Sequence, residues 1–137
     1  MIICENDINI DFLLPIKNHL SNKNIELLLV DNNAMREINK ETRNIDKSTD
    51  VLSFPYEYDF NPDSLIGSIV INTEMAKDAS EHFNHSYEDE IKLLFIHAML
   101  HILGYDHEVD NGEMREKEKE IISLFNLPTS LIIRTIG

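Results

Sequence analysis

The feature that most constrains this fold is one long stretch, residues 86–103, whose apolar side chains would cover nearly the whole circumference of a helix. Ser86-Tyr-Glu-Asp89 has the form of a capping box and marks its start, and Gly104 is the residue type that ends a helix. Its apolar positions are Ile91, Leu93, Leu94, Phe95, Ile96, Ala98, Met99, Leu100 and Ile102. A helix that is apolar nearly all round lies in the middle of its domain, so the other elements must pack around it.

The remaining chain alternates between strand-like and helix-like segments. Strands are expected at Ile2–Cys4, Ile25–Val30, Val51–Phe54 and Ile66–Asn72. Further helices are expected after Asp11, after a cap at Asn32 or Asn33, from Thr73 to about Phe83, and after a cap at Asp110. This alternation predicts a small sheet with helices packed on it, and the pattern alone leaves α+β and α/β both open.

Composition bounds the class of protein. A chain of 137 residues suits one domain, residues 1–137. The single cysteine, Cys4, excludes a disulfide framework and favours a cytoplasmic location, and we find neither a signal peptide nor an apolar run long enough to cross a membrane. The net charge of −13 argues against coating nucleic acid by charge alone. It does not exclude a local site, since charges beyond about 8 Å are largely screened in physiological salt.

Three histidines gather around the end of the central helix. His97 and His101 are four residues apart and therefore share one face, and Gly104 allows the chain to fold back and bring His107 to the same point. Three imidazole nitrogens on a tetrahedral ion leave one position for water, which is typical of a catalytic zinc. The sequence therefore predicts one Zn²⁺ ion bound by His97, His101 and His107.

The residue after the first histidine limits the chemistry. Zinc proteases of the His-Glu-x-x-His type use that glutamate as general base, and here the position is Ala98, which cannot take a proton. A zinc-bound water could instead attack a phosphodiester, and its transition state needs additional positive charge. Arg43 is our candidate for that charge, because a guanidinium binds phosphate with two parallel hydrogen bonds.

Three blocks of the chain resemble the YbeY family of bacterial rRNA-maturation factors. His97 through His107 is similar to the family signature His-Gly-x-Leu-His-Leu-x-Gly-Tyr-Asp-His. The second block is Asn39-Lys-Glu-Thr-Arg43 followed by Thr49-Asp50-Val-Leu-Ser-Phe-Pro55, and the third is Ile66-Gly-Ser-Ile-Val-Ile71. The resemblance covers residues 35–137.

The resemblance implies a zinc-dependent, single-strand-specific endoribonuclease. It implies roles in 16S rRNA 3′-end processing, small-subunit maturation and ribosome quality control, with single-stranded rRNA and the ribosomal small subunit or its proteins as partners. It also implies an α+β domain in which a central buried helix and a mixed, roughly four-stranded sheet flank a metzincin-like metal site. On this interpretation His97 and Arg43 are catalytic, and Arg43 also binds the substrate.

The chain departs from the family pattern at Ala98 for Gly, Ser48 for Pro and Ser68 for Asp. The last change puts in doubt a supporting role for that carboxylate near the metal. Asp106 would either orient a ligand or shape the turn after Gly104. The charged run Glu113–Glu120 is expected to be a solvated helix face, and solvent exposure is also expected for His19, His82 and His85.

Two other functions remain open. A metal-dependent peptidase would need another carboxylate, such as Glu108, as its base. A non-catalytic assembly factor would use the zinc to brace its fold, and its acidic surface would suit a basic ribosomal protein.

Overall fold

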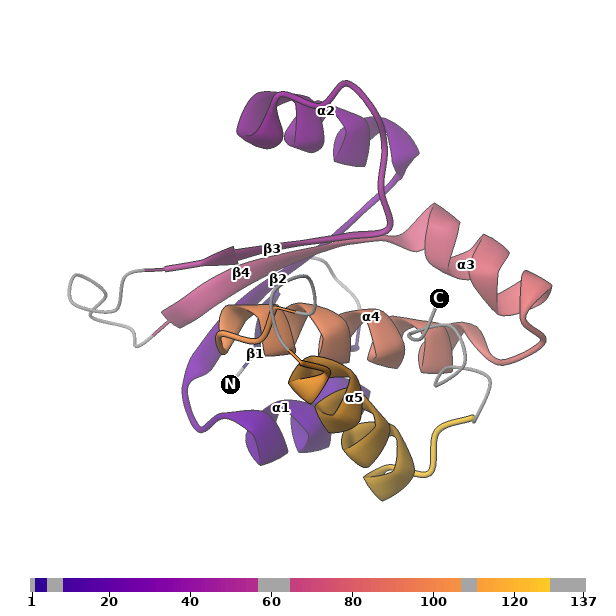
Figure 1. Cartoon of the computed structure of the whole chain (residues 1–137). Coiled ribbons are helices and arrows are strands. Elements are labelled where there is room, and N and C mark those ends of the chain that lie inside the picture. The colour runs from indigo at the N-terminus through magenta and orange to yellow at the C-terminus, as the bar shows by residue number, and fades with distance from the viewer. Residues whose placement is uncertain (1, 5–8, 57–64, 107–110, 129–137) are drawn as a thin grey trace.

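The central helix, α4 (Tyr87–Ile102), crosses the middle of the molecule against one face of a four-stranded sheet (Figure 1). The computed structural model describes residues 2–4, 9–56, 65–106 and 111–128. The strands are β1 (Ile2–Cys4), β2 (Asn24–Val30), β3 (Val51–Pro55) and β4 (Leu65–Asn72). The other helices are the 3₁₀ turn η1 (Asp11–Leu13), α1 (Leu14–Leu20), α2 (Asn32–Arg43), α3 (Thr73–His82) and α5 (Glu113–Leu124).

The sheet has the strand order β1-β2-β4-β3 and is mixed. β1, β2 and β4 run parallel, and β3 pairs antiparallel with β4 at the sheet edge, with Val51 opposite Ile71 and Pro55 opposite Gly67. The predicted α+β domain with a central buried helix and a mixed four-stranded sheet is therefore confirmed.

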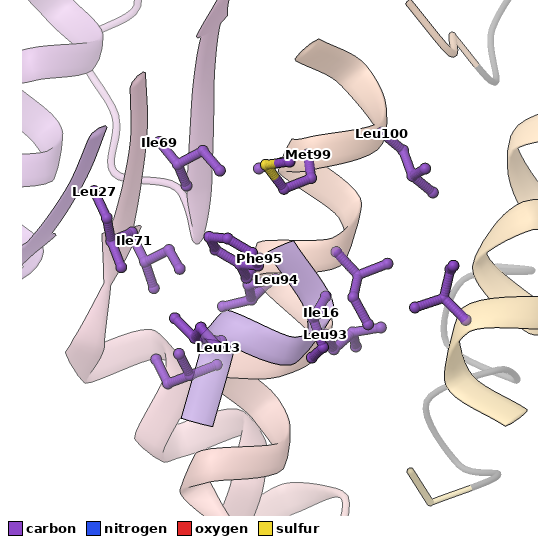
Figure 2. Close-up of a cluster of buried hydrophobic side chains, with 14 of the residues drawn as sticks. Leu13, Ile16, Leu27, Ile69, Ile71, Leu93, Leu94, Phe95, Met99 and Leu100 are labelled. Atoms are coloured by element: carbon purple, nitrogen blue, oxygen red, sulfur yellow. The ribbon is translucent and has the colours of Figure 1, made fainter. Parts of the chain in front are cut away.

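The main core lies between the sheet and α4. Ile69 and Ile71 from β4 meet Phe95 and Met99 of α4, and all four side chains are fully buried (Figure 2). The opposite side of α4 carries Leu93 and Leu100 toward α1 and α5, so apolar groups surround the helix. Nine of the 16 residues of α4 are buried, and burial of apolar surface stabilises a protein by about 25 cal/mol per Å², so α4 is firmly held.

The other face of the sheet is covered by α2 (Figure 1). Met35 packs there on Leu52 and Val70, which form a second, smaller core. Side chains alternate along β4, so Val70 faces α2 while its neighbours Ile69 and Ile71 face α4.

Side chains cap the starts of α2, α3 and α4, and the capping residues differ in part from those expected. Ser86 accepts a hydrogen bond from the Asp89 backbone N–H at 3.0 Å, as the capping box predicts. The cap of α2 is Asp31, whose carboxylate accepts from the Ala34 N–H at 2.8 Å, so the expected cap at Asn32 or Asn33 is wrong. α5 begins at Glu113 after Gly112 at the cap position, where no side chain caps the helix, so the expected cap at Asp110 is wrong.

A buried asparagine ties together the elements that follow β2 and β4. Asn72 is fully buried and its amide donates to Asn32 Oδ1 at 2.6 Å, Ser48 Oγ at 3.0 Å and the Thr49 carbonyl at 3.2 Å. The side-chain oxygen of Asn72 caps α3 by accepting hydrogen bonds from the backbone N–H groups of residues 74 and 75. This single side chain therefore fixes the segment that leads into Thr49-Asp50.

None of the helices in the described ranges is both long and apolar enough to span a bilayer.

Candidate metal-binding site

Two of the three predicted ligands meet near the end of α4. His97 Nε2 and His101 Nε2 lie 3.2 Å apart, and the two rings are nearly perpendicular, with centroids 4.7 Å apart. The four-residue spacing places both imidazoles on one helix face, as predicted. Because α4 is the most deeply packed helix, the backbone beneath both rings is held rigidly.

A buried carboxylate contacts the other nitrogen of the first ring. His97 Nδ1 lies 2.7 Å from Glu118 Oε1 on α5, and the exposed fraction of the side chain is 31% for His97 and 3% for Glu118. Glu118 was expected on a solvated helix face, and that expectation is wrong. Its spacing from Met114 and Ile121 (i−4 and i+3) places all three on the buried face of α5, a signal that the sequence contained.

The end of α4 is built as predicted around Gly104. This glycine has a φ of +103°, a left-handed conformation that is strained for residues with a Cβ. Its N–H donates to the His101 carbonyl at 3.1 Å, and the Tyr105 N–H donates to the Leu100 carbonyl at 2.9 Å. These bonds satisfy carbonyls at the helix end and turn the chain away from the helix axis.

The third predicted ligand, His107, lies outside the described residues, as does Glu108. Within residues 2–4, 9–56, 65–106 and 111–128, no group of three or more His, Cys, Asp or Glu side chains could hold a metal ion. Asp106 is exposed after the turn. The described site therefore consists of His97, His101 and Glu118.

The two imidazoles fit a tetrahedral zinc. Zinc–nitrogen bonds of about 2.0–2.1 Å at the tetrahedral angle separate two ligand nitrogens by about 3.3 Å, close to the 3.2 Å between His97 Nε2 and His101 Nε2. A metal-binding histidine usually donates its other N–H to a carboxylate or carbonyl, and Glu118 stands in that position for His97. The donor types and their spacing therefore suit the ion that the sequence predicts.

Residue 98, where zinc proteases carry their catalytic glutamate, is buried. Ala98 is 1% exposed and belongs to the main core. A glutamate there would place a charge among apolar side chains at high cost. Proton transfer at this site must therefore involve a group other than residue 98.

Arg43 lies on the other side of the sheet from the histidines. It is exposed and is the last residue of α2, the helix that covers the sheet face opposite α4 (Figure 1). Asn39, one turn earlier, is buried and donates its amide to the Lys47 carbonyl at 2.8 Å, which fixes the loop after Arg43. The structure thus brings His97 and His101 together but does not place Arg43 beside them.

A second arginine on α2 has a carboxylate partner. Arg36 Nε donates to Asp46 Oδ1 at 2.7 Å, and this guanidinium lowers the pKa of Asp46 through the hydrogen bond and its charge. Both side chains are exposed, with exposed fractions of 56% and 52%. Part of the positive charge of Arg36 is therefore balanced locally.

Ser68 also faces away from the histidines. Gly67 faces α4, so alternation along β4 directs Ser68 to the α2 side of the sheet. Its hydroxyl donates to Glu26 Oε1 at 3.1 Å, and the two residues are paired across β2 and β4. The carboxylate at this point of the sheet is therefore supplied by Glu26, and the structure does not bring Ser68 to the predicted metal.

A second histidine–carboxylate pair occupies the other end of α4. His85 Nε2 lies 2.8 Å from Glu90 Oε1, with side-chain exposed fractions of 3% and 1%. The expected solvent exposure of His85 is wrong, because the turn between α3 and α4 folds its ring onto α4. His19 and His82 are exposed as expected.

Comparison with known proteins shows how far the likeness extends. The model of the family described as Endoribonuclease YbeY matches residues 9–126. The Endoribonuclease YbeY of Campylobacter jejuni strain 81-176 is 59% identical over 127 residues, which are 93% of this chain and 94% of that protein. The one from Nautilia profundicola is 55% identical over 128 residues, covering 93% and 91% of the two chains. The solution structure of TM1509 from Thermotoga maritima aligns with a TM-score of 0.60 and 25% identity over 96% of this chain and 89% of that one.

Matches of this extent, on this fold, place the chain among hydrolases that cleave RNA internally. The chain belongs to the YbeY endoribonuclease family. The resemblance and the hydrolase class predicted from the sequence are thereby confirmed. The zinc ligands, the role of Arg43 and the ribosomal partners stay predictions.

Proposed function

We propose that this protein is a zinc-dependent endoribonuclease that cleaves single-stranded rRNA. The observation that carries this proposal is the pair of imidazole nitrogens 3.2 Å apart, one ring backed by a buried carboxylate, in a chain of an endoribonuclease family. The biological setting that we propose is 16S rRNA 3′-end processing, small-subunit maturation and ribosome quality control in the cytoplasm.

Each proposed site residue has a distinct task. His97 and His101 hold the zinc from the rigid helix, and His107 provides the third nitrogen after the turn at Gly104. When bound, the ion supplies a water of lowered pKa and positive charge for the phosphodiester. Ala98 offers no carboxylate that could act as a base.

Arg43 supports cleavage by holding an RNA phosphate. Its helix covers the sheet face opposite α4, and β3 is the edge strand of that sheet. A flexible single strand that passes this edge would reach both α2 and the end of α4, whereas a stiff duplex would not bend so sharply. The placement of Arg43 therefore favours a single-stranded substrate.

The acidic surface supports a further contact with ribosomal protein. The net charge of −13 repels the RNA backbone outside the site and attracts basic proteins. We propose that the small-subunit partner of this enzyme includes a basic ribosomal protein.

The experiment that tests this function is a cleavage assay on single-stranded RNA with metal-stripped and zinc-restored protein. We expect cleavage only after zinc is restored, and a loss of about 100-fold or more in His101→Ala, since the ion would lose a ligand. His82→Ala, which removes an exposed histidine on α3, serves as the matched control. Equal cleavage by the stripped and the restored protein would overturn zinc dependence.

An unstructured peptide incubated with the same zinc-restored sample separates the endoribonuclease from a metal-dependent peptidase. We expect the peptide to stay intact, because Ala98 cannot act as a base. Peptide hydrolysis without RNA cleavage would reverse the assignment.

A further inference from the structure

We propose that Glu118 is a positioning residue that sets the tautomer and the ring orientation of His97 for metal binding. This inference rests on the proposed zinc site and assigns a task to a residue on another helix, 21 positions along the chain. Its basis is the contact of Glu118 Oε1 with His97 Nδ1, at 2.7 Å, combined with the burial of the carboxylate.

The contact determines which ring nitrogen of His97 carries the proton. Carboxylate oxygens accept hydrogen bonds, so the 2.7 Å contact favours the tautomer in which His97 Nδ1–H donates to Glu118 Oε1. In a neutral imidazole the proton on Nδ1 leaves Nε2 with a lone pair, and Nε2 is the nitrogen that faces His101. The bond also fixes the ring plane, because rotation of the ring would break the contact and move Nε2 away from His101.

The surroundings of Glu118 argue against a purely structural role. The side chain is 3% exposed on a helix face whose other buried members are Met114, Ile121 and Ile122. An apolar residue at this position would stabilise such a face at least as well as a buried charge does. What an apolar residue cannot do is accept a hydrogen bond from the imidazole.

α5 holds the carboxylate firmly enough for this task. Met114 is 1% exposed, and Ile121 and Ile122 are fully buried in the main core. These side chains flank Glu118 on both sides along the helix and pack α5 against the core that contains α4. The carboxylate is therefore held in place in the metal-free protein. It fixes the His97 ring in advance, so the ring loses less conformational freedom when zinc binds.

The chain offers a matched control for this pair. His85 and Glu90 form a His–carboxylate contact of 2.8 Å near the start of α4, with side-chain exposed fractions of 3% and 1%, against 31% and 3% for His97 and Glu118. Glu118→Gln and Glu90→Gln make the same chemical change in the two pairs. Only the first pair involves a proposed zinc ligand.

The first measurement is the affinity for Zn²⁺ in competition with a chromophoric chelator. We expect Glu118→Gln and Glu118→Ala to bind zinc about 10- to 100-fold more weakly than the wild type, because the supporting hydrogen bond is weakened or lost. Glu90→Gln should keep the wild-type affinity. Unchanged affinity in Glu118→Gln, or an equal loss in Glu90→Gln, would overturn the proposal.

The second measurement reads the tautomer in the metal-free protein from the imidazole nitrogen chemical shifts, at about pH 8, where imidazole is neutral. We expect His97 to carry its proton on Nδ1 in the wild type and to populate both tautomers in Glu118→Gln, since an amide can accept or donate. The same tautomer in both proteins would contradict the positioning role. If the wild type bound no zinc, the proposed function would fail, and the tautomer would still decide the role of Glu118.

Discussion

At the scale of single residues, the contacts of each side chain indicate which task it can perform. In His97, one ring nitrogen contacts Glu118 at 2.7 Å and the other lies 3.2 Å from the next histidine. The two arginines of α2 differ in whether a carboxylate contacts them. Arg36 contacts Asp46, whereas in the described part of the chain the structure gives Arg43 no carboxylate partner. Arg43 is therefore the better candidate to bind a phosphate.

That difference predicts unequal effects when either charge is removed. Arg43→Gln should reduce cleavage of single-stranded RNA by about 100-fold, the usual effect of losing one group that stabilises developing charge. Arg36→Gln makes the same change at another exposed arginine of the same helix, and it should have little effect on cleavage. The zinc content of both variants should match the wild type. An Arg43→Gln enzyme with normal activity, or equal losses in both variants, would exclude the proposed role.

Among the elements, β4 and the end of α4 depend on each other through one glycine. A Cβ on Gly67 would lie 2.8 Å from the Phe54 carbonyl oxygen and 2.9 Å from Ile102 Cδ1. The carbonyl belongs to the paired edge strand and cannot move without disturbing the ladder. Ile102 directly follows His101, so Gly67 allows β4 to pack closely against the end of α4 that carries the histidine pair.

Gly67→Ala should accordingly lower the free energy of unfolding by about 1–3 kcal/mol, as forced overpacking does. Urea denaturation measures this loss. Ile102→Val removes Cδ1, so the double variant should recover part of the loss, while the clash with the carbonyl remains. If Gly67→Ala unfolded at the wild-type urea concentration, the close packing of β4 on α4 would be refuted.

For the whole molecule, the two cores consist of apolar side chains and include neither histidine of the proposed metal site. α4 is surrounded by apolar side chains from the sheet, α1 and α5, and α2 covers a separate core on the far face of the sheet. The histidine pair lies at one end of this arrangement. This distribution is that of a site built on a stable scaffold and differs from a domain that a metal ion holds together.

Metal-stripped protein should therefore keep its circular dichroism spectrum and unfold cooperatively while losing RNA cleavage. Added zinc should raise the melting temperature, since a ligand that binds only the folded state stabilises it by about 2.7 kcal/mol at 100 times its dissociation constant. Calorimetry with and without a chelator measures the cooperativity of unfolding and the shift in melting temperature. An unfolded metal-free protein would instead support a zinc that braces the fold and a non-catalytic role.

The features that the sequence determined are those with a local cause. The all-round apolar pattern predicted the buried helix α4, Gly104 predicted its end, and the four-residue spacing predicted the meeting of His97 and His101. Each depends on helix geometry within a few turns of chain, where the period of 3.6 residues decides which side chains are neighbours.

Only the tertiary structure decided what depends on distant packing. Glu118 contacts His97, and His85 is buried, because α5 and the α3–α4 turn fold onto α4. Arg43 lies on the far side of the sheet because the connection between β2 and β3 passes over the face that α4 does not cover. Periodicity reports which face of an element is apolar, but which elements meet is settled by how those faces are buried together.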